Sequence, residues 1–232
     1  FVSRLAARRW VTDWQQRVVV SGAVGLTAGI NAEWTDVTDT DGTKEEQLRA
    51  GYAQATITPA ADLLLSVGAR FDDYTTFGGR GTGRLAAGYF IASAGLKVRA
   101  TYGTGFMPPS LAARYGGAYQ RSNPALRPER SRGFDVGADR FFAAGRGIVS
   151  ATYFRNELTD LLGFESAPFP DLGRSINIAR AQTEGLELSA RMETGRIDAR
   201  ASYTLLRAED RGPATADERR LIRRPRHAVA AD

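Results

Sequence analysis

VRATYGTGFMPPSLAARYGGAYQRSNPALRPERSRGFDVG, residues 98–137, is the stretch from which the fold can be worked out. At its start the side chains alternate: one side of residues 96–105 is apolar, and the other is polar or glycine. The apolar positions are Leu96, Val98, Ala100 and Tyr102, and the others are Lys97, Arg99, Thr101, Gly103 and Gly105. A period of two residues is typical of a β-strand. A second alternating segment begins after Pro128-Glu129, so the stretch reads as two strands and the connection between them.

The connection opens with Met107-Pro108-Pro109, which cannot continue a strand ladder because proline lacks an N–H and has a fixed φ. Ser110 is a good N-cap, and Gly116-Gly117 is a good stop, so the sequence predicts a short helix over Leu111 to Tyr115. The whole connection exceeds about twenty residues, whereas a hairpin loop has about two to five. Such length indicates either a function or disorder.

Short and long connections alternate along the rest of the chain. The expected short ones lie around residues 22–25, 59–62, 93–95, 144–147 and 193–196, and the expected long ones around 36–45, 73–82, 107–130, 163–175 and 209–220. An outer-membrane barrel has tight turns at one rim and long loops at the other, which a soluble sandwich has no reason to do. The strands between them are long enough to cross a bilayer. Residues 1–13 show no convincing period and are expected to be a loop or the end of a strand.

The strand candidates have one apolar and one polar face. In residues 197–205 the apolar row is Ile197, Ala199, Ala201, Tyr203 and Leu205, and the polar row is Asp198, Arg200, Ser202 and Thr204. Charged side chains on the inner face are costly in a dry core and cheap in a water-filled lumen. A two-layered soluble sheet would show the same rows. Amphipathicity alone leaves both folds open, and the alternation of loops favours the barrel.

Composition excludes several classes of protein. The chain has no cysteine, so it has neither a disulfide framework nor thiol chemistry. No run approaches the roughly eighteen apolar residues of a membrane helix. The net charge of +5 and 31 Lys and Arg would permit nucleic-acid binding, but the arginines are dispersed and form no basic helix, so no nucleic-acid partner is expected.

The central stretch resembles the most recognisable segment of TonB-dependent outer-membrane receptors. That family has a strand ending in Tyr-Gly-x-x-[Phe/Tyr]-x-x-Pro, an extracellular loop, and then Asn-Pro-x-Leu-x-Pro-Glu. The matching residues here are Tyr102, Gly103, Phe106, Pro109, Asn123, Pro124, Leu126, Pro128 and Glu129. Residues 177–188, with Gly185 and Glu187, and residues 223–227 resemble later family segments in the same order.

This resemblance implies an all-β fold, an antiparallel transmembrane barrel of twenty-two strands around a plug, of which about ten or eleven are visible here. Residues 1–232 would then be a fragment of a single barrel domain, with the plug and the closing strands outside it. The implied function is uptake of a scarce nutrient, an iron–siderophore complex or cobalamin, across the outer membrane of a Gram-negative cell. The implied partners are the TonB complex, acting through the plug, and the lipid bilayer with its lipopolysaccharide. The alternative is a passive porin-like or structural barrel without a plug.

Ligand-contact candidates lie in the longest loop: Arg114, Tyr115, Tyr119 and Arg121. Aromatic faces and guanidinium groups suit an anionic, partly aromatic chelate. A competing interpretation is that these are interfacial aromatics and ordinary loop polarity. The matched Pro109, Asn123, Pro124 and Pro128 are expected to build the loop rather than bind cargo.

No catalytic, cofactor or metal site is expected, and so no enzyme. His227 is the only histidine, which leaves no His-pair metal site, and a membrane-embedded hydrolase using it is a third, disfavoured hypothesis. Asp36, Asp39 and Asp41 have the oxygen spacing of a calcium loop, but the bidentate glutamate is lacking, so a solvated turn is expected. The glycine-rich residues 78–83 lack the Lys-Ser/Thr of a phosphate loop.

Overall fold

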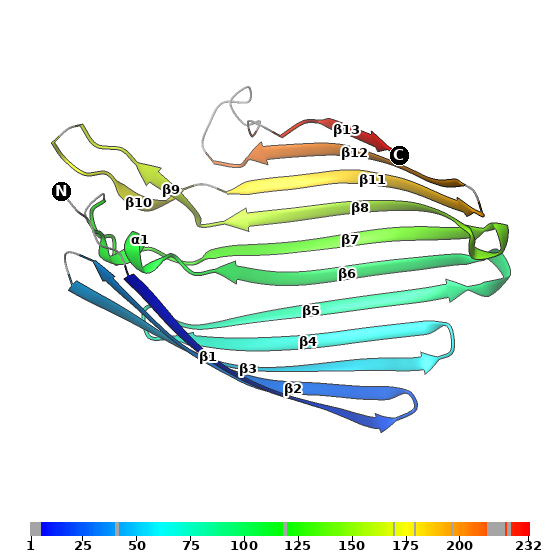
Figure 1. The fold of residues 1–232 in the computed structure, drawn as a ribbon, viewed down its shortest axis with the longest axis horizontal. Helices are drawn as coiled ribbons and strands as arrows, with labels where there is room; N and C mark the ends of the chain where they lie inside the picture. The colour runs from blue at the N-terminus through cyan, green and yellow to red at the C-terminus, as the bar shows by residue number, and fades with distance from the viewer. Residues whose placement is uncertain are drawn as a thin grey trace.

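Eleven strands form one antiparallel sheet whose order follows the sequence from β1 to β8 and then β11, β12 and β13 (Figure 1). The structure is a computed structural model, and it describes residues 6–39, 42–117, 120–168, 170–178, 180–195, 197–212, 221 and 224–232. The strands are β1 (Ala6–Ser21), β2 (Val24–Asp39), β3 (Gly42–Ala60), β4 (Leu63–Tyr74), β5 (Gly78–Ile91), β6 (Leu96–Met107), β7 (Glu129–Phe142), β8 (Gly147–Thr159), β11 (Ala181–Thr194), β12 (Ile197–Asp210) and β13 (His227–Ala231). A separate hairpin pairs β9 (Leu161–Glu165) with β10 (Arg174–Ile178), and the α-helix is α1 (Leu111–Tyr115). The predicted antiparallel all-β fold is therefore confirmed.

The two ends of the sheet differ. Tight turns join the strands at one end, on the right of Figure 1, and two of them are the 3-10 turns η1 (Ala92–Ala94) and η2 (Ala143–Gly145). The long connections that carry α1 and the β9–β10 hairpin gather at the other end. The two long connections around 107–130 and 163–175 thus lie at one end, as predicted, and residues 213–220 of the long connection expected around 209–220 lie outside the described residues.

Two predicted long connections are in fact short. The β2–β3 ladder continues to the pair Asp39 and Gly42, and the β4–β5 ladder continues to Tyr74 and Gly78. The polar residues that the sequence assigns to a loop are therefore paired within strands. Lys44 forms an ion pair with Asp39 at 2.5 Å within the β2–β3 hairpin. The strands at this side are consequently longer than a bilayer crossing of about nine to eleven residues requires.

Two other boundaries also differ from expectation. Residues 6–13, expected to be a loop or the end of a strand, belong to β1. They lack a hydrophobic period, but they are held in the strand by a complete ladder with β2 and by an Arg9–Glu33 ion pair of 2.5 Å. Residues 148–162 and 176–192, expected as continuous strands, are each divided. The first breaks at Asp160, whose φ of +58° turns the chain out of β8 and into the separate hairpin.

The sheet is a single layer with one apolar and one polar face. Val67 is 45% exposed and Ile197 is 63% exposed, so the apolar rows are not buried between layers. The two-layered alternative is therefore wrong. Buried hydrophobic residues occur instead toward the end with long connections: Leu48, Ala50, Leu111, Ala113, Leu126, Ala181 and Ala208. Within the described residues, no helix has both the length and the apolar character needed to cross a membrane.

Candidate functional site

The long β6–β7 connection is built around α1, which has the predicted bounds. The Ser110 Oγ accepts a hydrogen bond from the Ala113 N–H at 3.1 Å and caps the helix. Gly116 ends it with a φ of +77°, and a Cβ there would lie 2.7 Å from the Ser122 nitrogen. Both the backbone conformation and the close approach therefore require glycine.

Arg114 lies inside this loop. Its residue exposure is 8%, and its Nη1 donates to the Leu126 carbonyl at 2.8 Å, while Leu126 itself is 2% exposed. The Asn123 N–H donates to the Arg114 carbonyl at 2.8 Å. Arg114 thus ties the helix to the Asn-Pro-x-Leu segment, and direct contact with cargo stays a prediction that this buried position does not favour.

The β6–β7 loop is fastened to the segment that joins β8 to β11. Asn123 Nδ2 donates to the Ser175 carbonyl at 2.8 Å, and the Arg121 N–H donates to the Gly173 carbonyl at 2.8 Å. Asn177 makes three bonds: Oδ1 accepts from the Arg127 N–H at 2.8 Å, and Nδ2 donates to the carbonyls of Arg127 at 2.9 Å and Asp160 at 2.7 Å. The two loops therefore form one hydrogen-bonded assembly.

Asp160 adds a charged clamp to this assembly. Its carboxylate accepts from the Arg127 Nη2 at 2.6 Å and from the Arg130 Nη2 at 2.8 Å. Burial by itself would raise the pKa of Asp160, but the hydrogen bonds and positive charges of Arg130 and Arg127 outweigh it and hold that pKa below its usual range. The carboxylate is accordingly ionised at neutral pH.

Other motif residues also hold the loops. Glu129 Oε1 accepts from the Leu162 N–H at 2.7 Å, and Pro109 and Pro128 are buried. Pro124 is exposed next to Asn123, at the junction of the two loops. These contacts give the Asn-Pro-x-Leu-x-Pro-Glu segment a structural role.

The remaining ligand candidates occupy different places. Tyr115, at the end of α1, is 41% exposed, and Arg121 is exposed beside the contact with Gly173. Tyr119 lies outside the described residues. The exposed positions of Tyr115 and Arg121 leave both side chains accessible from the loop surface.

The motif residues on strands make ring contacts and ladder pairs. Tyr102 is 43% exposed on the apolar face, and Phe106 makes edge contacts with the rings of Tyr74 and Phe77 at 6.0 and 6.4 Å. Gly103 pairs with Gly133 across β6 and β7. Glu187 is exposed on the polar face, where it pairs with Thr152 and Thr204.

Gly185 is needed for close packing within the sheet. A Cβ at this position would collide with the Leu205 carbonyl oxygen, and it would lie 2.8 Å from the Phe154 ring. The absence of a side chain lets Phe154 cover the backbone of β11.

The polar face carries its own ion pairs. Arg99 Nε pairs with Asp139 at 3.2 Å and Arg99 Nη2 donates to Thr152 at 2.7 Å, which connects β6, β7 and β8. These charges suit a water-filled interior.

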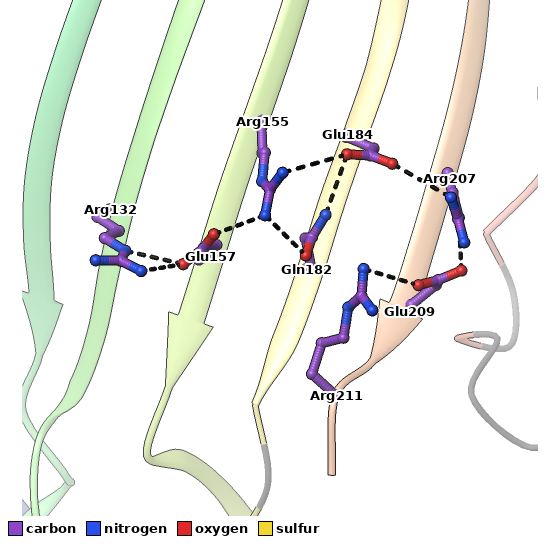
Figure 2. Close-up of polar contacts among 8 residues, drawn as sticks. All are labelled: Arg132, Arg155, Glu157, Gln182, Glu184, Arg207, Glu209 and Arg211. Carbon is purple, nitrogen blue, oxygen red and sulfur yellow. Dashed lines mark hydrogen bonds and ion pairs between the residues drawn. The ribbon is translucent and has the colours of Figure 1, made fainter. Parts of the chain in front are cut away.

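Sequence reasoning missed a second set of charges, which we call the charge ladder (Figure 2). It crosses β7, β8, β11 and β12 and consists of Arg132, Glu157, Arg155, Gln182, Glu184, Arg207, Glu209 and Arg211. The register places it on the apolar face, just beyond the apolar rows, because Arg155 pairs with Phe134 and lies two residues from Tyr153. The sequence signal that could have revealed it is the repeated spacing of an arginine and a glutamate two residues apart, as in Arg155-x-Glu157 and Arg207-x-Glu209, which places both charges on one face of a strand.

His227 and Asp39, two residues considered above for catalysis or metal binding, make contacts between neighbouring strands. His227 begins β13, and its Nδ1 lies 2.8 Å from the Tyr203 hydroxyl. Asp39 pairs with Lys44, and Asp41 lies outside the described residues.

A single-layered antiparallel sheet with one exposed apolar face, one charged face and interlocked loops at one end defines the wall of a transmembrane β-barrel. The comparisons with known proteins identify which kind. The family described as TonB dependent receptor-like, beta-barrel, matches residues 4–232. The chain therefore belongs to this family, whose members are receptors and transporters, and membership implies an outer-membrane location.

Individual relatives differ in their cargo. The chain is 28% identical to the Vitamin B12 transporter BtuB of Photobacterium profundum, a match that covers 96% of this chain and 36% of that protein. The siderophore receptor PirA of Pseudomonas aeruginosa has a TM-score of 0.78 at 18% identity, over 90% of this chain and 44% of that one. The copper transporter OprC has a TM-score of 0.74 at 15% identity, over 94% of this chain and 39% of that one. The chain thus spans less than half of each relative and shares the barrel fold with all of them.

Proposed function

We propose that the protein to which this chain belongs is an outer-membrane receptor that imports cobalamin or an iron–siderophore complex through a plugged barrel, with energy supplied through TonB. Residues 1–232 would be one piece of its barrel domain, with the plug and the closing strands contributed by other parts of the protein. The observation that carries this proposal is the interlocked pair of loops above a two-faced sheet in a chain of the receptor family. Family membership does not favour the passive barrel.

The loop geometry supports two different roles for the candidate residues, contact with the cargo and support of α1. Tyr115, Tyr119 and Arg121 would contact the cargo, and Arg114 would hold α1 in place from beneath through the Leu126 carbonyl. Tyrosine offers a rigid aromatic face, and arginine offers a fork of donors for carboxylate or phosphate groups.

The cellular function is tested by deleting the complete gene and supplying either cobalamin or a ferric siderophore as the limiting nutrient. Growth on one of these nutrients should fail in the deletion strain and return with the intact gene, but only in cells with a working TonB system. Complementation that is independent of TonB would contradict the proposal and favour the passive barrel.

The capture residues are tested in the full-length receptor with Tyr115→Ala and Arg121→Ala. We expect binding of the identified cargo to weaken by about tenfold for each, the scale of one charge-assisted or stacking contact. Arg146→Ala is the control, because Arg146 is also exposed but lies at the tight turn at the opposite end of the sheet. Equal affinity in all three variants would exclude these two residues from the site.

A further inference from the structure

A hollow of about 350 Å³ lies on the polar face of the sheet, over β3, β4 and β5, and we call it the inner hollow. Two neighbouring rows of paired residues form it: Tyr52, Arg70 and Thr82 in one row, and Gln54, Gly68 and Arg84 in the other. Gly68 is the middle residue of its row and has no side chain, so the surface is recessed between Gln54 and Arg84. Arg84 also pairs with Gly103 of β6. A glycine therefore stands on each side of the Arg84 side chain.

Tyr52 forms the wall of the inner hollow on the side of β3. Its hydroxyl donates to the Gln15 Oε1 of β1 at 2.9 Å, and its ring reaches across Gly29 of β2, where a Cβ would lie 2.5 Å from the ring. The hydrogen bond and the close approach at glycine hold the ring in place. The guanidinium carbon of Arg70 lies 5.8 Å from the centre of this ring. A fixed aromatic face thus borders the hollow.

The two arginines that line the inner hollow differ in their partners. Arg70 pairs with Asp72 through Nε at 2.8 Å and through Nη2 at 2.7 Å, so its charge is balanced. Arg84 is exposed, and no hydrogen bond or ion pair joins its guanidinium to another described residue. Among the described residues that line the hollow, none has a carboxylate. The hollow therefore holds one uncompensated positive charge.

Neutral donors stand beside this charge. The Gln54 amide and the Thr82 hydroxyl line the same hollow, and neither side chain is bonded to another described residue. A guanidinium next to an amide and a hydroxyl can donate several hydrogen bonds to the oxygens of one anionic group. The chemistry of the lining thus suits an anion that carries a flat ring.

We propose that the inner hollow is a second site for imported cargo, and that it binds an anionic aromatic group with its oxygens at Arg84 and its ring against Tyr52. The volume is that of a small-molecule site, and a single acidic side chain of the protein would fill only a small part of it. This inference rests on the proposed import function. Of the two cargo classes proposed above, an iron–siderophore complex with aromatic chelating groups carries such oxygens.

The inner hollow is separate from the loops that would capture cargo first. Arg70 lies four residues before Tyr74, the last residue of β4, which is about 13 Å along the strand. The hollow faces the interior of the barrel at this depth. Cargo that left Tyr115 and Arg121 would reach it on the way inward, so the two sites would act in series.

The probe is isotopically labelled salicylate, a flat ring with a carboxylate, measured by equilibrium dialysis against the full-length receptor in detergent. Arg84→Gln should weaken binding by about tenfold, because one charge-assisted contact is lost. Gly68→Leu should weaken it to a similar degree by filling the hollow while keeping every charge. A Cβ at Gly68 makes ordinary contacts, at 3.5 Å from the Ala53 carbonyl oxygen, so the strand accepts it. Salicylamide, which lacks the carboxylate, should bind the unaltered receptor about tenfold more weakly than salicylate does.

The controls match each variant. Lys97→Gln removes one positive charge from the same polar face, and Gly88→Leu adds the same side chain there, but neither residue lines the inner hollow. A Cβ at Gly88 would have its nearest neighbour, Lys97 Cε, at 3.9 Å. Both controls should bind salicylate as the unaltered receptor does.

The possible outcomes separate this inference from the proposed function. Loss of salicylate binding that is confined to Arg84→Gln and Gly68→Leu supports the site. Binding that is unchanged in both of them, equally weakened in the controls, or equally strong for salicylamide overturns it. Unchanged binding with a lower thermal unfolding midpoint in Arg84→Gln would assign Arg84 to a contact within the receptor and overturn it as well. The purified receptor needs no TonB to bind salicylate, so a failure of the growth test for import would leave the dialysis result unaffected.

Discussion

Asn177 joins three backbone groups from two loops that are distant in sequence. Replacing it with alanine removes the partners of the Arg127 N–H, the Arg127 carbonyl and the Asp160 carbonyl. Since each such bond contributes about 1 kcal/mol, the free energy of local loop opening should fall by about 2–3 kcal/mol. Hydrogen exchange of amides in residues 120–130 and 160–178 of the full-length receptor should accelerate by about 30- to 160-fold.

Asn31→Ala provides the comparison for that measurement. Asn31 makes a single exposed bond, from its Nδ2 to the Thr12 carbonyl at 3.3 Å. Exchange in the loops should not respond to its loss. Acceleration of the same size in both variants would show that Asn177 has no special role in joining the loops.

The Asp160 clamp has a defined pH dependence. A carboxyl whose folded pKa is depressed stabilises the fold above its ordinary pKa, and that contribution is lost as the pH falls through the folded value. Because the pKa of Asp160 is lowered, loop protection should stay constant from pH 8 to about pH 5 and decline below about pH 4. Asp160→Asn should weaken protection above about pH 5, and the difference from the unaltered receptor should shrink at lower pH, since asparagine tolerates the φ of +58° but carries no charge. A decline centred near neutral pH in the unaltered receptor would contradict this assignment.

At the scale of single elements, β11 depends on a missing side chain. Gly185→Ala should lower the unfolding free energy of the full-length receptor by about 1–3 kcal/mol, because its Cβ would meet the Phe154 ring and the Leu205 carbonyl. Urea unfolding in detergent measures the change. In Gly51→Ala, on β3, the new Cβ would meet nothing within 4 Å, so that variant should unfold like the unaltered protein. Equal stability of the two alanine variants would refute the packing argument.

The sequence predicts some elements well and others poorly, for local physical reasons. The bounds of α1 follow from Ser110 and Gly116, whose capping roles depend on their immediate neighbours. β1 was not recognised in full because an ion pair and the ladder with β2, both long-range, support its first half. The sequence predicts loops at the two hairpins around 39–42 and 74–78 because their residues are polar or glycine. In the structure these residues nevertheless pair across the strands, which is a long-range contact.

The candidate site likewise has features that the sequence predicts and others that it does not. The loop that holds the ligand candidates could be located from its prolines and its length. The burial of Arg114 could not be, because the Leu126 carbonyl that accepts its hydrogen bond is positioned by the fold of the whole loop. The bonds from Asn177 likewise join it to Arg127 in the first loop, 50 positions away, and to Asp160 at the end of β8, 17 positions away, and no local pattern encodes either of them.

For the molecule as a whole, the apolar band has the dimensions of a membrane. On β12 the apolar row extends over eight residue steps, from Ile197 to Leu205, and each step rises about 3.4 Å, so the row is about 27 Å long along the strand. Tilting such a strand by about 40° gives a height of about 21 Å, near the roughly 25 Å of outer-membrane barrels. The charge ladder begins where this row ends, at Arg207.

The effect of a charged substitution on stability should therefore depend on whether the residue lies on the apolar or the polar face of the sheet. Leu188→Arg lies within the apolar band and should destabilise the receptor in lipid vesicles by about 2–4 kcal/mol. Ser189→Arg, the next residue on the polar face, should have little effect because it faces water. Urea unfolding of both variants in vesicles measures the contrast, and equal destabilisation would mean that the faces have been assigned the wrong way round.

The lengths of β1, β2 and β3, at 16, 16 and 19 residues, have a consequence for the outline of the receptor above the bilayer. A crossing needs only about nine to eleven residues. The surplus is paired backbone that continues the wall past the apolar band, and it stands beside the β6–β7 loop, because Lys44 of β3 donates to the Gly116 carbonyl at 3.4 Å. The extended hairpin and the loop that carries α1 therefore brace each other at this rim of the wall.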